Sequence, residues 1–462
     1  MAEVQNLWKS KRKYFINLIF FLISIIVIVA IWPHDKNDTW HETLGRFILV
    51  TSCYLVLYMF LSHFRADVLQ VTRKTLFIIL TILSFIVLTR YALKFPDKNF
   101  LLLIPIAIIP VVIRTFYDAR LALFILLITI MLAGFIVPDP FRFVFMSFIS
   151  GMVAIFTLTN LYRRAKFFFT ALMVFVSYSL LYIGISLMQH GNIENVHWSD
   201  FILFAGNGIL VLISYPLIFV FENRFLFLSD ASLLELADTN QPLLRKLAEE
   251  APGSFQHSLQ VVNLAEEAAR IIGANPLLVR TGALYHDIGK IANPKYYIEN
   301  LNDGLSPHEK LNPYESSKVI INHTKNGVVL AKNFKVPIQI IDFIRTHHGT
   351  TTAYFFFKKY IDQYQGNTDK EKDFKYPGPK PFSKETAVVM MADAVEAASR
   401  SLGSYTEESI SEMVERIIYI QEQDGQFSDV PFTFKDISDI KNVFKKRLSN
   451  IYHVRISYPE RG

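Results

Sequence analysis

Residues 284–290 read LYHDIGK, and in this stretch His286 directly precedes Asp287. Two polar neighbours on a helix are the ordinary interpretation. The chemical interpretation is a pair of metal ligands, because imidazole nitrogen and carboxylate oxygen together suit Fe, Mn or Zn, whereas oxygen-only sites suit Mg or Ca. Cys53 is the single cysteine, so a thiolate metal site and an intrachain disulfide are excluded. The rest of the chain decides between the two interpretations.

Histidines gather in the same half of the chain. Six of the twelve fall between His257 and His348. One such histidine is more often a hydrogen-bonded core residue than a ligand. The grouping changes that balance, because several of these histidines lie on or at the end of predicted helices, and a further helix adds an aspartate. The candidate metal ligands are His257, His286, Asp287, His323, His347, His348 and Asp393.

A shared carboxylate would let these seven groups hold two ions. A carboxylate can bridge through its two oxygens, which a neutral imidazole cannot do. With Asp287 as the bridge, two ions about 3.5–4 Å apart would share a hydroxide and clamp a phosphate. Lys290 lies on the same helix face and is a candidate for catalysis and phosphate binding, or else a solvated lysine at a helix end. Arg400 either meets a phosphate or pairs with Glu396.

The first half of the chain predicts a membrane domain. Hydrophobic residues make up 52% of the sequence and phenylalanines number 40. Eight apolar stretches each approach the ~20 residues that cross a bilayer as a helix. They cover roughly 14–32, 46–62, 75–92, 100–114, 121–137, 143–160, 166–188 and 200–221. The fourth carries Pro105 and Pro110, which predict a broken or tilted span.

Basic residues precede the first span and follow the second, fourth and sixth, with an exception at 90–98. The positive-inside rule therefore predicts a cytoplasmic N-terminus and, after eight crossings, a cytoplasmic second half. The net charge of +6 is weak evidence for nucleic acid, so no nucleic-acid polymer is expected as a partner. The lipid bilayer is the expected partner of the membrane domain.

The second half is predicted to be almost entirely helical. The predicted organisation is a basic N-terminal segment over 1–13, a membrane domain over 14–221, amphipathic linker helices over 222–253 and an all-α domain over 254–462. Residues 364–381 predict a long surface loop. HVRISYP, residues 453–459, is the only strand-like stretch. The fold class is mainly α, a polytopic helical membrane domain followed by an all-α cytoplasmic domain.

The pattern of His257, the His286–Asp287 pair and Asp393 resembles that of HD-domain metal-dependent phosphohydrolases. Longer stretches, among them ALYHDIGKIANPKYYIEN (283–300) and KYPGPKPFSKETAVVMMADAVEAASR (375–400), resemble the seven-transmembrane HD hydrolases of the PgpH type. With the membrane half, the resemblance covers most of the chain. It does not extend to the large extracytoplasmic domain of that family, whose place is taken here by the short stretch 33–45. That stretch belongs either to a naturally short form or to a shortened chain.

The resemblance implies a bacterial inner-membrane phosphodiesterase that hydrolyses cyclic di-AMP to linear pApA with two transition metal ions, Fe or Mn. The first ion would be held by His257, His286, Asp287 and Asp393, and the second by Asp287, His323, His347 and His348. Tyr354 could stack on adenine, although an aromatic run on a helix is more often core. A homodimer is compatible with the sequence, which leaves the oligomeric state open.

Two alternatives remain at this point. The domain could bind a cyclic dinucleotide as a membrane receptor or scaffold with little turnover, or it could hydrolyse a different cyclic dinucleotide. A complete set of candidate ligands favours the enzyme. The adenine preference depends on the resemblance alone, and the ligands accept Fe and Mn equally.

Overall fold

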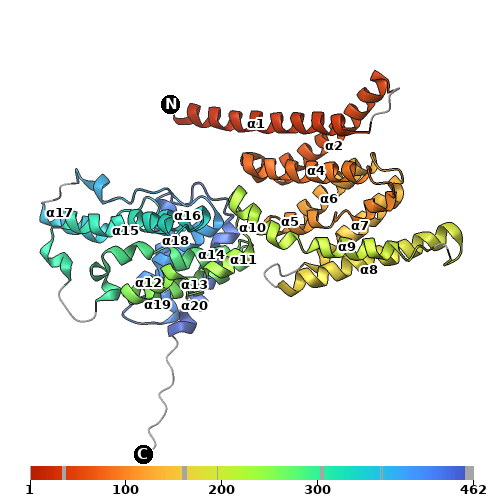
Figure 1. Ribbon diagram of the computed structural model, residues 1–462. Coiled ribbons are helices and arrows are strands. Elements are labelled where there is room, and N and C mark those ends of the chain that lie inside the picture. Colours follow the sequence, from red (N-terminus) through yellow and green to blue (C-terminus); the bar gives the residue numbers. More distant parts are fainter. Residues whose placement is uncertain are drawn as a thin grey trace, which may run out of the picture. The chain divides into compact units, whose positions relative to one another are not determined.

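The computed structural model describes residues 2–33, 38–158, 164–194, 196–301, 306–364, 366 and 368–452. These residues form helices and loops, with one isolated β-bridge between Thr352 and Lys375 and no strand. The chain divides into two compact units, Met1–Ser229 and Asp230–Gly462 (Figure 1). Residues 453–459, where the sequence predicts a short strand, and residues 34–37 of the short stretch lie outside the described part of the chain.

The first unit is built from apolar helices. Their bounds are α1 (Ala2–Ile31), α2 (Trp40–Phe64), α3 (Ala66–Gln70), α4 (Thr72–Ala92), η1 (Lys98–Leu103), α5 (Ile108–Phe116), α6 (Ala119–Gly134), α7 (Pro140–Thr157), α8 (Arg164–His190), α9 (Asp200–Val211) and α10 (Ser214–Phe225). Among the described residues, seven segments are long and apolar enough to cross a membrane. The protein is therefore a multi-pass membrane protein.

The number of full-length spans differs from the eight that the sequence predicts. The predicted span over 121–137 corresponds to α6, which has 16 residues and is the shorter apolar helix. At 1.5 Å per residue it measures about 24 Å, less than the ~30 Å of a hydrocarbon core. Asp118 caps its N-terminus by accepting from the Leu121 amide, which fixes where the helix begins.

The predicted break in the fourth apolar stretch is present. η1 ends at Leu103 and α5 begins at Ile108, with Pro105 between them. A break inside an apolar unit leaves backbone carbonyls without partners, which is costly where water is absent. The buried side chain of Asn207 resolves this, because its Nδ2 donates to Leu102 O at 2.8 Å and Ile104 O at 2.9 Å.

The second unit is a helical domain. Its helices are α11 (Asp230–Leu236), α12 (Pro242–Glu250), α13 (Pro252–Ile271), α14 (Pro276–Tyr285), η2 (Ile288–Ala292), η3 (Pro294–Tyr296), η4 (Ile298–Asn300), η5 (Pro307–Lys310), α15 (Pro313–Asn333), α16 (Ile338–Thr346), α17 (Tyr354–Gln363), η6 (Glu371–Phe374), α18 (Lys384–Ser399), α19 (Glu407–Gln423) and α20 (Phe434–Tyr452). Helix α14 packs against α13, α16 and α18, and α18 also packs against α13 and α16 (Figure 1). Helix α15 packs on α16 and η2.

The linker and the long loop also take structure. Two short helices, α11 and α12, occupy the region predicted as an amphipathic linker, and they pack on α14 and α13 of the second unit. The predicted surface loop 364–381 is exposed in part, but Phe374 and Tyr376 are buried. The loop therefore contributes side chains to the interior of the second unit.

Candidate metal centre

Five segments of the second unit bring the seven candidate ligands together. His257 lies within α13, His323 within α15 and Asp393 within α18. The HD pair occupies the junction where α14 ends and η2 begins. The pair His347–His348 directly follows α16. All seven side chains except that of His348 are buried.

The first group of donors consists of His257, His286 and Asp393, whose ligand atoms all lie within 4.8 Å of one another. Nε2 of His257 is 2.9 Å from Asp393 Oδ1, and Nε2 of His286 is 3.6 Å from the same oxygen. Two imidazoles and one carboxylate therefore converge on a single point in the interior.

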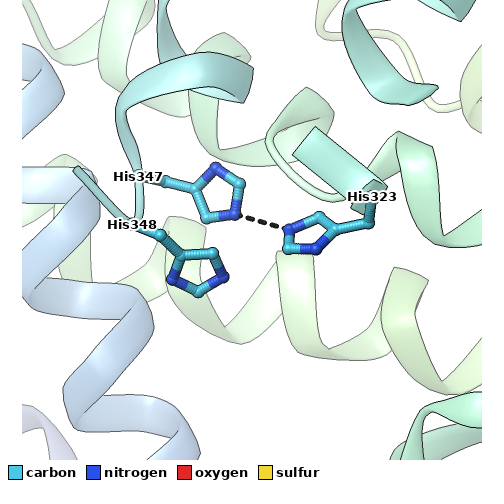
Figure 2. Close-up of side chains that lie close together, drawn as sticks. All are labelled: His323, His347 and His348. Carbon is cyan, nitrogen blue, oxygen red and sulfur yellow. Dashed lines mark hydrogen bonds between the residues drawn. The ribbon is translucent and has the colours of Figure 1, made fainter. Parts of the chain in front are cut away.

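The second group consists of His323, His347 and His348, also within 4.8 Å. Figure 2 shows the three rings turned toward one another, with Nε2 of His323 3.0 Å from Nε2 of His347. His348 is partly exposed, with 27% of its side chain accessible. This group therefore has one side open to solvent.

Asp287 stands between the two groups and turns one oxygen to each. Its Oδ2 lies 3.3 Å from Nε2 of His286 and 3.7 Å from Nε2 of His257. Its Oδ1 lies 3.4 Å from Nε2 of His323 and 3.7 Å from Nε2 of His347. This is the arrangement that a bridging carboxylate requires.

Backbone contacts orient the rings. Nδ1 of His286 donates to Ala283 O at 2.7 Å, and Nδ1 of His323 donates to Ile320 O at 2.6 Å. Nδ1 of His347 contacts the carbonyls of the preceding turn in the same way, at 3.0 Å from Ile344 O. A carbonyl only accepts, so Nδ1 carries a proton in each of these rings and Nε2 is the atom that faces the centre. Nε2 of His286 and Oδ1 of Asp287 are buried without a hydrogen-bond partner, as expected of atoms that await a cation.

Electrostatics separates the two groups. Burial lowers the pKa of His323 and of His347, and lowers the pKa of His348 to about 3, so these rings are neutral and keep free lone pairs. Burial also opposes protonation of His286, but the charges of Asp287 and Asp393 outweigh it and raise its pKa to about 10. The carboxylates of this first group therefore favour a positive charge beside them, which a divalent cation would supply.

Lys290 does not face an open site. Its Nζ lies 2.7 Å from Asp287 Oδ2 and 2.8 Å from Glu299 Oε1. Burial alone would lower the pKa of Lys290, but these two carboxylates raise it, so the side chain is a fixed cation. The solvated lysine that the sequence allows as an alternative is absent, and the ammonium is already paired with two acids.

Arg400 pairs with Glu396, which is one of the two roles that the sequence allows. Its Nε and Nη2 donate to Glu396 Oε1 at 2.9 Å and 2.6 Å. Oε2 of Glu396 in turn accepts from Nδ1 of His257. Arg400 thus holds Glu396, and Glu396 holds His257 of the first donor group. Because Nε and Nη2 of Arg400 are already bonded to Glu396, they are not free to bind a phosphate.

A cleft of about 940 Å³ lies in the same unit, and none of the seven candidate ligands lines it. Tyr297 and Glu299 line it on the side of Lys290, and the ring centroids of Tyr297 and His323 are 6.1 Å apart. Tyr354, the aromatic side chain singled out from the sequence, is 66% exposed and is not among the lining residues. Phe355 and Phe356, the next two residues along α17, are.

Sequence reasoning missed Glu299 and Tyr376. The Tyr376 ring lies 4.2 Å from that of His348 and is buried. Neither residue falls on a periodic pattern, because Glu299 sits in consecutive 3-10 turns and Tyr376 in the loop before α18. The supporting role of Glu396 had a signal, since it follows Asp393 by one helical turn.

Comparison with known proteins places these features in a family context. The family model described as "7TM receptor with intracellular HD hydrolase" matches residues 40–229, and the HD domain model matches residues 254–398. The cyclic-di-AMP phosphodiesterase PgpH of Bacillus subtilis (strain 168) is 36% identical over 398 residues, which cover 83% of this chain and 55% of that protein. PgpH of Listeria monocytogenes serotype 1/2a (strain 10403S) is 32% identical over 460 residues, 98% of this chain and 60% of that protein.

The chain thus spans less than two thirds of the length of either relative. The crystal structure of the L. monocytogenes PgpH HD domain in complex with cyclic di-AMP is 42% identical, covers 46% of this chain and 100% of that chain, and has a TM-score of 0.45.

Proposed function

This chain belongs to the family of seven-transmembrane proteins with an intracellular HD hydrolase domain, and from that premise we propose that it is a membrane-anchored, metal-dependent phosphodiesterase that hydrolyses cyclic di-AMP to linear pApA. Two relatives bear the name of cyclic-di-AMP phosphodiesterase, at 36% and 32% identity. The observation that carries the proposal is Asp287, with one oxygen toward each of two buried donor groups.

We assign the ligands by these two groups. His257, His286 and Asp393, with Oδ2 of Asp287, would hold the first ion. His323, His347 and His348, with Oδ1 of Asp287, would hold the second. Histidine and carboxylate donors fit Fe or Mn. Two such ions supply a hydroxide nucleophile at neutral pH and neutralise the charge that develops on a phosphate.

The remaining polar residues position this machinery. Lys290 holds Asp287 from one side and shares its charge with Glu299, which assigns it to positioning rather than to phosphate binding. Glu396 keeps the proton of His257 on Nδ1, so that Nε2 faces the first site. Arg400 fixes Glu396 in turn.

The cleft that Tyr297 and Glu299 line is the proposed binding site of the nucleotide. Its volume of about 940 Å³ lies within the usual range of small-ligand sites. Tyr297, Phe355 and Phe356 offer aromatic surface, and stacking on a base is worth about 1–3 kcal/mol per base. Lys359 adds a cation for a phosphate oxygen. We therefore assign base contact to Phe355 and Phe356 rather than to Tyr354.

The proposed location is a bacterial cytoplasmic membrane, with the N-terminus and the catalytic domain over 254–462 on the cytoplasmic side. The basic residues before the first span and after alternate spans support this orientation. Intracellular nucleotide second messengers are found on that side.

The test is hydrolysis by the purified full chain in detergent. Cyclic di-AMP, cyclic di-GMP and pApA are incubated separately with Mn²⁺ or Fe²⁺, the products are separated by chromatography, and metal content is measured on the same sample. We expect pApA from cyclic di-AMP in the wild type and in a His63→Ala control, which removes an exposed histidine of the first unit. The double variant His286→Ala, Asp287→Ala should neither bind metal nor form product.

Tight binding of cyclic di-AMP by a metal-loaded wild type that forms no pApA would overturn the enzyme in favour of a receptor. Faster turnover of cyclic di-GMP would overturn the proposed substrate while leaving the proposed chemistry intact.

A further inference from the structure

A second cavity lies in the first unit and is not part of the metal centre. Its volume is about 370 Å³, and it is formed where α8 ends and α7 and α9 begin. Most of the residues that line the cavity are polar, among them Asn99, Arg142, Tyr182, Ser186, His197 and Asp200. A polar cavity among apolar helices is costly unless a ligand or water satisfies it.

Arg142 is the cation of this cavity. Its Nε and Nη2 atoms are buried and have no hydrogen-bond partner in the described part of the chain. Its guanidinium carbon lies 5.0 Å from the centre of the Tyr182 ring, within reach of a cation–π interaction. Arg65, elsewhere in the unit, pairs instead with Asp67 and Asp118.

The two unpartnered atoms define the kind of group that fits. Nε and Nη2 form one fork of the guanidinium, with two parallel N–H bonds on the same edge. Such a fork matches the two oxygens of a carboxylate or phosphate. A lone neutral acceptor would satisfy only one of the two donors.

The same cavity also carries a negative charge. Asp200 is 4% exposed, and its carboxylate accepts from Asn99 Nδ2 at 3.2 Å and 3.4 Å and from the Tyr182 hydroxyl. A carboxylate offers about four lone-pair sites, so acceptor capacity remains. Oγ of Ser186, also buried, has no hydrogen-bond partner among the described residues. An anion alone would meet repulsion from Asp200, whereas a molecule that also carries an ammonium group would not.

We propose that this cavity binds a small zwitterion of the α-amino-acid class, with its carboxylate on the Nε–Nη2 fork of Arg142 and its ammonium group on Asp200. The site is independent of the proposed hydrolase activity. A phosphatidylethanolamine headgroup pairs the same two charges, so the experiment has to separate a free amino acid from a lipid.

The experiment measures ligand-induced stabilisation of the purified full chain in detergent. Each of the twenty amino acids is titrated separately while the thermal unfolding midpoint is recorded. We expect at least one to raise the midpoint, and its amide and its des-amino analogue, which lack one charge each, to fail. This comparison needs no variant and is unaffected by misfolding.

Variants then locate the site. Arg142→Lys keeps a positive charge but removes the fork, and we expect affinity for the stabilising amino acid to fall about tenfold or more. The matched control is Arg120→Lys, which alters an exposed arginine at the start of α6 and should bind like the wild type. Equal binding by Arg142→Lys and the wild type would overturn the assignment.

The lipid arm compares nanodiscs with and without phosphatidylethanolamine. If no amino acid stabilises the wild type while phosphatidylethanolamine does so through Arg142, the amino-acid proposal is overturned in favour of the headgroup. If neither stabilises it, the site is refuted. Hydrolysis of cyclic di-AMP is assayed on the same samples, so failure of this proposal is distinguishable from failure of the proposed enzyme.

Discussion

The ammonium group of Lys290 lies 2.7 Å from Oδ2 of Asp287, inside the donor cluster rather than at its mouth. The Lys290 side chain is therefore a fixed cation within the cluster. A second carboxylate, that of Glu299, completes the triad at 2.8 Å. The consequence is that the charge of Asp287 is partly balanced before any ion or substrate arrives.

This relationship predicts a metal-dependent stability defect. Replacement of Lys290 by Met leaves buried Asp287 and partly buried Glu299 without their cation, and loss of one partner of a buried ion pair costs about 3–5 kcal/mol. We expect a loss of about 3 kcal/mol in the free energy of unfolding of metal-free protein, and a smaller loss in metal-loaded protein, where a divalent ion would balance Asp287. Denaturant unfolding with and without chelator measures both values.

The control for this variant is Lys295→Met, an exposed lysine of η3 that should leave stability within about 0.5 kcal/mol of the wild type. A second substitution, Glu299→Gln, should recover part of the loss in the Lys290 variant. An equal loss with and without metal would contradict the proposed position of the ions next to Asp287.

The bridging position of Asp287 predicts an unequal effect on metal content. Asp287→Asn removes a ligand from both sites, so we expect fewer than about one ion per chain where the wild type holds about two. His323→Ala removes a ligand from the second site only and should retain the first ion. Elemental analysis after dialysis gives both numbers. If the two variants lost the same amount of metal, Asp287 would not be shared.

The chain Arg400–Glu396–His257 predicts a positioning effect without direct contact to substrate. Loss of such an outer partner typically lowers metal affinity about 10- to 100-fold. We expect Glu396→Gln to weaken metal binding in that range, because an amide cannot balance the charge of a protonated or metal-bound His257. Titration with Mn²⁺ measures the change.

Arg400→Lys tests the competing role at the same place. If Arg400 acts through Glu396, the variant should bind metal more weakly and keep its KM for cyclic di-AMP at saturating metal. A raised KM with unchanged metal affinity would instead assign Arg400 to phosphate binding.

The sequence predicts the metal ligands better than it predicts the residues that surround them. All seven candidate donors are brought together, because each lies on or beside a helix and the grouping is visible along the chain. The partner of Lys290 was not foreseen, since Glu299 arrives through consecutive 3-10 turns that have no periodic signal. Tyr354 does not line the cleft whereas Phe355 and Phe356 do, because helical spacing tells which residues are neighbours but not where the first turn of α17 points.

The membrane half shows the same limit. Apolar runs indicate where helices lie, and Pro105 indicates a break. They do not indicate that Asn207 supplies the hydrogen bonds which that break requires, because its partners lie about a hundred residues away in the chain. Nor do they fix where α6 begins, which depends on the cap at Asp118.

The last prediction concerns Gly289, which lies in η2 and packs closely against α15. A Cβ at this position would collide with the backbone carbonyl of His323 and would lie 2.6 Å from the amide nitrogen of Gly327. Backbone atoms cannot turn aside as a side chain can, so η2 would have to move away from α15 and carry Asp287 away from His323. We expect Gly289→Ala to lower the free energy of unfolding by about 1–3 kcal/mol and to weaken binding of the second ion more than the first. Gly403→Ala is the matched control, since a Cβ there meets nothing within 4 Å. Unfolding and metal titration of the two variants check the prediction, which fails if Gly289→Ala behaves like Gly403→Ala.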